Sequence, residues 1–272
     1  MKKIFLLFAV LSLCMCTHKP STLTILHTND THSQVLPKDN GQGGYARRMG
    51  YIAQERSKDP NLLLLDAGDF SQGTTFFNFF HGRIEVDALN RMGYDVVCLG
   101  NHELDNGVDT LAAILKDARF EVVCANYDVR GSALEGIVKP YTILYRNGLK
   151  IGVFGLGCTP TGLIDAARFA PLTYLPPYET AQRVATLLKK RKHCDVVICL
   201  SHQGTQASSE GDCSDEELIA NTRDIDLVIG GHTHKVYDDF RVTNLDGQDI
   251  PLVQAGKSGA KIGKIALKTG AF

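Results

Sequence analysis

The segment VVCLGNHELD, residues 96–105, shows the pattern that decides the fold of this chain: a short apolar run leading into glycine, amide, imidazole and carboxylate side chains. The same pattern recurs where apolar runs at 23–26, 62–65, 196–200 and 227–229 lead into polar segments. Those polar segments are Asp30-Thr31-His32, Gly68-Asp69, Ser201-His202 and Gly231-His232-Thr233-His234. A short apolar run bounded by turn residues is typical of a buried strand. The sequence therefore predicts an α/β fold whose strands end in polar loops.

These polar segments are expected to meet at one edge of the fold. In open α/β sheets, ligands bind in the crevice outside the carboxyl ends of the strands, so strand ends rich in Asp, Asn and His predict a shared site. None of the segments contains the thiolate ligands that structural metal sites often use. Seven oxygen and imidazole ligands suit a pair of metal ions, which at about 3.5–4 Å apart can clamp a phosphoryl group.

Taken together, the motifs resemble the calcineurin-like metallophosphoesterases. The resemblance rests on NDTH at 29–32, on Gly68-Asp69 with Gln72-Gly73-Thr74 after it, and on the Gly-Asn-His-Glu, Ser-His and Gly-His-Thr-His segments, in the order of the family. Within the family, the chain is most similar to the 5′-nucleotidase and UDP-sugar hydrolase branch. HTNDTH at 27–32, NHELDNG at 101–107 and VQAG at 253–256 carry that finer resemblance.

The resemblance implies a four-layer α/β/β/α sandwich, with two mixed sheets face to face and helices outside. It also implies a role for each motif residue. Asp30, His32 and His234 hold one divalent metal ion, Asn101, His202 and His232 hold the other, and Asp69 bridges both. His102 is the catalytic histidine, and Asp105 orients it; two side chains three residues apart on a helical turn can face each other.

The implied activity is hydrolysis of phosphate monoesters, most of all 5′-nucleotides, by in-line attack of a metal-bound water or hydroxide. Two other functions stay open at this point. One is a neighbouring hydrolase, such as a 2′,3′-cyclic-nucleotide phosphodiesterase or a sulfur-compound hydrolase; the other is a non-catalytic metal-binding or scaffolding protein. The ligands suit Mn, Zn or Fe, and the sequence does not identify the metals.

Composition is that of an ordinary globular protein. The chain has 272 residues, 44% of them hydrophobic and 22% charged, which is enough for one extensive core. The formal net charge of −1 gives no basic surface for a nucleic-acid polymer, so we expect a small nucleotide or other phosphate ester as substrate. Residues 17–272 are expected to form a single catalytic domain.

The first 16 residues are predicted to be a signal peptide, because Lys2 and Lys3 precede a short apolar run at 4–15. The mature chain is therefore expected to be exported, to the periplasm of a bacterium or to its membrane as a lipoprotein. Cys14 or Cys16 is the candidate lipidation site, with Cys16 favoured, and simple cleavage stays equally open. A lipid anchor would be the only contact with the membrane.

Helical periodicity predicts helices at 44–58, 76–92, 108–118, 178–192 and 214–222, the last with a capping box between Ser214 and Glu217. Asn147-Gly148 between two apolar runs predicts a hairpin, because this pair suits a type I′ turn. The proline-rich stretch at 159–177 is interpreted as a connection passing over the sheet. The phenylalanines at 76–80 are interpreted as core in preference to a nucleobase stack.

A few other residues receive specific predictions. Cys98, Cys124 and Cys199 lie in apolar strands and are expected to be buried thiols, while Cys194 and Cys213 are the pair to test for a disulfide. His27 is the best candidate for a contact behind the ligands, and Glu103 is expected to be a structural hydrogen-bond partner.

Members of the branch usually continue into a C-terminal domain that contacts the nucleoside, and this sequence stops at Phe272. The C-terminal specificity domain is therefore expected to be absent. Three accounts stay open: a separately encoded partner domain, which we favour, a stand-alone phosphatase of broad range, or a truncated product.

Overall fold

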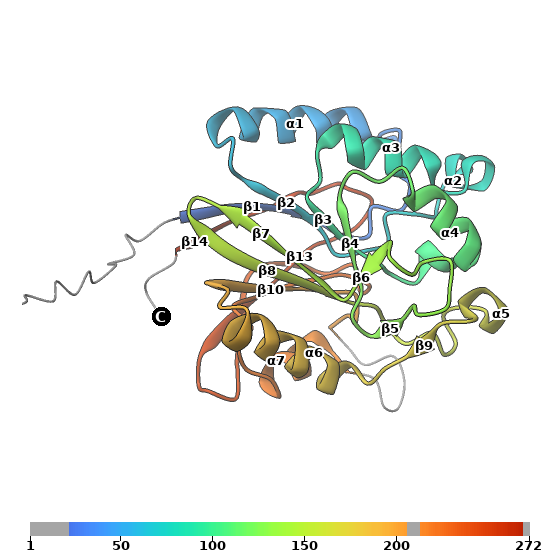
Figure 1. The fold of residues 1–272 in the computed structure, drawn as a ribbon. Helices are drawn as coiled ribbons and strands as arrows, with labels where there is room; N and C mark the ends of the chain where they lie inside the picture. Colours follow the sequence, from blue (N-terminus) through green and yellow to red (C-terminus); the bar gives the residue numbers. More distant parts are fainter. Residues whose placement is uncertain (1–21, 206–212, 269–272) are drawn as a thin grey trace, which may run out of the picture.

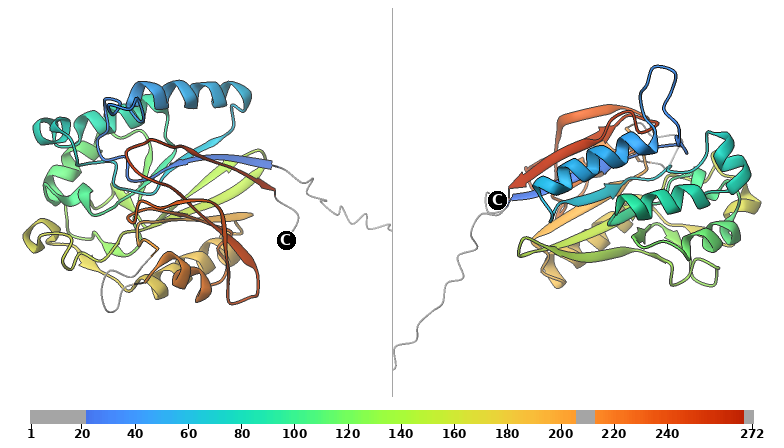
Figure 2. Two further views of the ribbon diagram at one scale, coloured as in Figure 1. Left: turned by 180° about the vertical axis from the view of Figure 1, so that it is seen from behind. Right: turned by 90° about the horizontal axis from the view of Figure 1, so that it is seen from above.

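Residues 22–205 and 213–268 are described by the structure, a computed structural model. The predicted signal segment 1–16, with Cys14 and Cys16, lies outside these residues. The described chain begins and ends at the same place, because Thr22 at the start of β1 pairs with Lys268 at the end of β14 (Figure 2).

Two six-stranded sheets form the centre of the molecule. The first has the order β14 (Gly263–Lys268), β1 (Thr22–Thr28), β2 (Leu63–Asp66), β3 (Val96–Cys98), β4 (Glu121–Val123) and β6 (Val138–Lys139). The second has the order β12 (Val236–Thr243), β13 (Asp249–Ala255), β11 (Leu227–Gly230), β10 (Val196–Ser201), β8 (Leu149–Leu156) and β7 (Tyr141–Arg146). The first sheet combines parallel strands with one antiparallel edge strand, β14, and the second with two, β12 and β7, so both are mixed.

Helices cover the outer face of each sheet (Figure 1). The first sheet carries α1 (Tyr45–Lys58), α2 (Thr75–Phe80), α3 (Arg83–Met92), the 3-10 turn η1 (His102–Leu104) and α4 (Val108–Leu115). The second carries α6 (Pro177–Thr186), its π-helical continuation η2 (Leu187–Arg191) and α7 (Asp215–Ala220). The connection between β8 and α6 contains α5 (Ala166–Phe169) and β9 (Thr173–Tyr174), which pairs with β5 (Tyr127–Asp128).

Side chains that point alternately to the two faces of each strand hold the layers together. On β2, Leu63 and Leu65 pack against the second sheet, while Leu64 packs against the helices. On β10, Ile198 packs between the sheets and Val197 packs against the helices of its own side. Successive side chains of a strand point to opposite faces, and both faces are covered here, which explains the continuous apolar runs in the sequence. The predicted four-layer α/β/β/α sandwich is confirmed.

The two sheets touch backbone to backbone at one edge. The Ala125 N–H, just after β4, donates to the Gly155 carbonyl on β8 at 2.8 Å. A Cβ at Gly155 would lie 2.2 Å from the Val123 carbonyl oxygen, so only glycine fits this position. At the opposite edge, β12, β13 and β14 line a groove of about 460 Å³. The sandwich is therefore closed at β4 and β8, and open at β12 and β14.

Two local predictions are confirmed. Residues Asn147 (φ 50°) and Gly148 (φ 79°) form the tight turn of the β7–β8 hairpin, with both φ angles positive as a type I′ turn requires. Ser214 and Glu217 form the capping box of α7.

The single helix predicted at 76–92 is wrong, because the chain breaks it into α2 and α3. His81 and Gly82 have φ angles of 53° and 102°, and this left-handed conformation ends one helix before the next begins. The core interpretation of the phenylalanines is correct only for Phe77. Phe79 is 77% exposed and Phe80 47% exposed, since the short α2 has one covered face.

The disulfide considered between Cys194 and Cys213 does not form, because Cys194 is a free thiol. Cys194 lies two residues before β10, whereas the Cys213 thiol contacts Gln203, two residues after β10. A six-residue strand is about 20 Å long, and a disulfide needs Cα atoms within about 7 Å. Cys98, Cys124 and Cys199 are buried thiols as predicted.

Within the described residues, none of the helices combines the length and the apolar character needed to cross a bilayer.

Candidate metal centre

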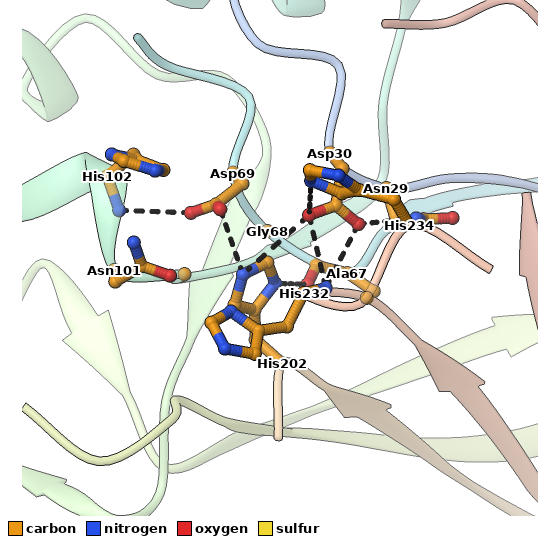
Figure 3. A network of polar contacts seen from close by, with 12 residues as sticks. Asn29, Asp30, Ala67, Gly68, Asp69, Asn101, His102, His202, His232 and His234 are labelled. Atoms are coloured by element: carbon orange, nitrogen blue, oxygen red, sulfur yellow. Dashed lines mark hydrogen bonds and ion pairs between the residues drawn. The ribbon is translucent and has the colours of Figure 1, made fainter. Parts of the chain in front are cut away.

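The carboxyl ends of five central strands bring the predicted ligands together (Figure 3). Asp30, Asp69 and Asn101 follow β1, β2 and β3 of the first sheet, while His202 and His232 follow β10 and β11 of the second. Figure 3 shows Asp69 between Asp30 and His102, with His202 below it. The site therefore lies where the two sheets face each other.

Several of these side chains stand on strained backbone. The φ angles of Asp30, His32, Asp69, His232 and His234 are 48°, 45°, 56°, 69° and 56°. A non-glycine residue in this left-handed region costs of order 1–3 kcal/mol, and such residues gather at functional sites.

One cluster consists of Asp30, His32 and His234, whose ligand atoms all lie within 4.8 Å of one another. The Nε2 atoms of His32 and His234 are 3.0 Å apart, and Asp30 Oδ1 is 3.3 Å from His234 Nε2. The three groups point at a common position, as ligands of one ion do.

A second cluster consists of Asp69, His202 and His232, and a third group places Asp69 beside His32 and His102. Asp69 thus belongs with residues of both predicted ligand sets. Asn101 is 5% exposed, and its Oδ1 accepts from the Cys158 thiol at 3.6 Å.

His202 provides a test of whether these residues fit a metal ion. Its Nδ1–H donates to the Ala67 carbonyl at 2.7 Å, which leaves Nε2 as the ligand atom. Nε2 is buried and lies 3.1 Å from Asp69 Oδ2, with which it forms an ion pair when the ring is protonated. An imidazole Nε2 and a carboxylate oxygen this close can hold one ion between them once the ring has lost its proton. A carbonyl behind the ring is the usual partner of a ligating imidazole. The residues fit.

The two imidazoles of the second cluster, His202 and His232, have pKa values shifted in opposite directions. Burial disfavours the charged form of His202, but the Asp69 and Asp30 carboxylates outweigh burial and raise its pKa to about 10. Burial and the nearby His202 lower the pKa of His232 to about 4. Burial opposes the ionisation of Asp69, but His202 holds its pKa well below the usual range. An ion that binds His202 must displace its proton.

His102 and Asp105 are in contact as predicted. His102 Nδ1 lies 2.9 Å from Asp105 Oδ2, and the two side chains are 29% and 30% exposed. Burial lowers the pKa of His102, but the bond to Asp105 and the charge of Asp69 raise it overall. The backbone N–H of His102 also donates to Asp69 Oδ1 at 3.0 Å.

Behind these residues, Glu103 joins two ligand loops. Its carboxylate accepts the backbone N–H groups of Asp69 at 2.9 Å, Gly100 at 2.6 Å and Ser71 at 3.0 Å. This is the structural role predicted for Glu103.

His27 occupies a different position from the one predicted. The imidazole lies against Gly263 of β14 and faces Asp238 and Lys261, and no candidate ligand is among its described contacts. The sequence motifs also predict no role for the side chains of Asn29 and Gln254, which are buried beside the ligand loops.

A sequence model of calcineurin-like phosphoesterases matches residues 23–236. The chain belongs to this family. Its resemblance to the 5′-nucleotidases is also confirmed: this calcineurin-like phosphoesterase is 34% identical over 270 residues to the snake venom 5′-nucleotidase of Crotalus adamanteus, covering 89% of this chain and 44% of that protein.

Solved structures of nucleotidases are also similar to this chain. The 5′-nucleotidase precursor of Thermus thermophilus is 31% identical, with a TM-score of 0.78, over 92% of this chain and 54% of that one. The NAD nucleotidase of Haemophilus influenzae is 28% identical, with a TM-score of 0.82, over 92% of this chain and 48% of that one. This phosphoesterase chain spans about half the length of the relatives that it matches.

Proposed function

We propose that this calcineurin-like phosphoesterase hydrolyses phosphate monoesters, above all 5′-nucleotides, with two divalent metal ions. The observation that carries the proposal is the pair of ligand clusters that meet at Asp69, next to the His102–Asp105 pair. Asp30, His32 and His234 would hold one ion, and Asn101, His202 and His232 the other, with Asp69 between them. Bound there, two ions polarise the phosphoryl group and lower the pKa of water.

His102 is the residue of this chain that meets the substrate. Its Nδ1 is held by Asp105, so Nε2 is the nitrogen left to donate a proton or hydrogen bond to a phosphoryl or leaving-group oxygen. The raised pKa favours the protonated ring, which a phosphate dianion needs. General acid help of this kind contributes about 10²–10⁴-fold.

Substrate class is tested by phosphate release from AMP and from p-nitrophenyl phosphate, side by side, with the purified and Mn-reconstituted chain. We propose that a partner domain supplies nucleoside recognition, since the residues assigned here act on the phosphoryl group. The expected result is cleavage of the aryl ester with little preference for AMP. Fast and selective AMP cleavage would show that this chain recognises the nucleoside itself and would contradict the partner proposal. No cleavage by the metal-loaded chain would favour the phosphodiesterase or the non-catalytic function.

The role of His102 is tested with His102→Ala. The turnover number is expected to fall by about 10²–10⁴-fold while metal content, measured by mass spectrometry, stays the same. His193→Ala is the control, because His193 is an exposed histidine that precedes β10, at the end of the sheet away from the ligands. An unchanged rate in the metal-loaded His102→Ala variant would exclude the assignment.

Export belongs to the same proposal. The apolar segment after Lys2 and Lys3 supports an exported chain, released into a bacterial periplasm or attached to the membrane through Cys14 or Cys16. Labelling with radioactive palmitate in a bacterial host, compared with a Cys16→Ser variant, distinguishes attachment from release.

A further inference from the structure

The end of β13 contains a buried glutamine that the proposed chemistry does not use. Gln254 is 0% exposed. Its Nε2 donates to the Gly231 carbonyl at 2.8 Å, and its Oε1 accepts from the Lys235 N–H. Gly231 directly precedes His232, and Lys235 directly follows His234. One amide therefore spans the loop that carries two candidate ligands.

The residues that follow Gln254 hold a ligand loop of the other sheet. Asn29, next to Asp30, is 2% exposed; its Oδ1 accepts from the Ala255 N–H at 2.7 Å, and its Nδ2 donates to the Gly256 carbonyl at 2.7 Å. The same Nδ2 donates to Asp30 Oδ2 at 2.5 Å. The segment 254–256 thus holds loops from β1 and from β11 at once.

Backbone hydrogen bonds to Asp30 also connect these loops directly. The His232 N–H lies 3.0 and 3.1 Å from the two oxygens of Asp30, and the Ser258 N–H donates to the Asp30 carbonyl at 2.7 Å. Asp30, His232 and His234 all have positive φ angles, a conformation that persists only when surrounding contacts determine it. Beside these bonds, the loops are held by the side chains of Gln254 and Asn29, two neutral, buried amides that add no charge to the site.

We propose that Gln254, together with Asn29, is a positioning residue that holds Asp30, His232 and His234 in their ligating conformation before metal binds. His234 lies in one ligand cluster and His232 in the other, on the same loop. Loss of the Gln254 amide therefore weakens the binding of both ions. The inference rests on the proposed metal pair, and it does not depend on which ester is hydrolysed.

The test is calorimetric titration of Mn²⁺ into the EDTA-treated full chain, with Gln254→Met as the variant. Methionine keeps the volume and removes the hydrogen bonds to Gly231, Lys235 and Thr233. Partners that orient metal ligands contribute about 10–100-fold to metal affinity, and a loss of this size is expected at both ions.

Gln182→Met is the matched control. Gln182 Oε1 accepts from the Arg223 N–H at 2.9 Å, and its Nε2 donates to the Arg223 carbonyl at 3.3 Å, so it too holds a loop with one amide, but away from the ligands. Its Mn²⁺ affinity is expected to match wild type. If Gln254→Met lowers only the melting temperature of the metal-free protein and binds Mn²⁺ like wild type, Gln254 is merely structural and the inference is wrong.

A second variant covers the case in which Gln254→Met does not fold. Gln254→Asn keeps a neutral amide that is one carbon shorter and cannot bond the Gly231 carbonyl and the Lys235 N–H at once. A smaller loss of affinity at both ions supports the inference, and wild-type affinity overturns it. Ester hydrolysis is not a readout here, so a chain that binds Mn²⁺ and cleaves no ester contradicts the proposed function alone.

Discussion

The two sheets contribute different chemistry to the candidate site. The first sheet supplies every candidate oxygen ligand, Asp30, Asp69 and Asn101, together with His32, while the second supplies only the candidate imidazoles His202, His232 and His234. Asp30, His32 and His234 come from both sheets, as do Asp69, His202 and His232, whereas the group of His32, Asp69 and His102 lies on the first sheet alone. Neither sheet alone carries the ligands for two metal ions. The site therefore depends on the packing that sets the distance between the sheets.

The largest expected effect is that of removing the carboxylate at which the clusters meet. Asp69 from the first sheet lies 3.1 Å from His202 of the second. Asp69→Ala is expected to lower metal affinity by more than about 100-fold, because even residues behind the ligands contribute 10–100-fold. Metal content after dialysis and rate of ester hydrolysis measure the loss. Asp87→Ala, which removes an exposed carboxylate of α3, is the control; two ions retained by the Asp69 variant would refute the bridging assignment.

A smaller effect is expected from changing the packing between the sheets without touching a ligand. Leu65 of β2 packs against the second sheet and Leu64 against the helices, and both are fully buried. Leu65→Ala and Leu64→Ala are each expected to reduce the free energy of unfolding by about 2–5 kcal/mol.

Only Leu65→Ala is expected to weaken Mn²⁺ binding as well, since only that cavity lies between the two halves of the site. Urea unfolding and calorimetry separate the two quantities. Equal Mn²⁺ affinities in the two variants would show that the spacing of the sheets does not control the site.

The smallest effect concerns His27, which projects from β1 toward Asp238 and Lys261. Burial lowers the pKa of His27 from 6.5 to about 4, although Asp238 opposes the shift. The unfolded chain therefore binds a proton that the folded chain excludes, and stability is lost as the pH falls from 6.5 toward 4.

His27→Gln is expected to reduce this dependence and to leave the pH dependence above about 7 unchanged, as followed by urea unfolding of the metal-free protein. An identical pH profile in the two proteins would mean that His27 stays neutral in the unfolded state or charged in the folded one.

Most of the fold could be predicted, because its decisive signals are local. Each apolar strand and the polar loop that follows it are continuous in the sequence, as in residues 96–105, so both the layers and the edge that carries the site follow from short segments. The break at His81 and Gly82 was missed since apolar residues continue at helical spacing through it. The exposure of Phe79 and Phe80 depends on that break.

The support behind the site could not be predicted in the same way. Gln254 and Gly231 are 23 residues apart, and Asn29 and Ala255 are 226 apart, so their bonds exist only after the strands have assembled. The position of His27 depends likewise on β14, which returns from the end of the chain to pair with β1. Sequence motifs marked these residues, and only the assembled sheets show what they touch.

The hydrogen bond to Gly155 at the closed edge provides a spectroscopic probe of the contact between the sheets. The amide proton of Ala125 is the donor to Gly155 across the two sheets, so it exchanges with solvent when this contact between the sheets opens. Its rate of exchange with deuterium therefore measures the free energy of separating the sheets, in contrast to amides paired within a single sheet. A single backbone proton thus reports whether an ion at the site closes the whole molecule or only its own loops.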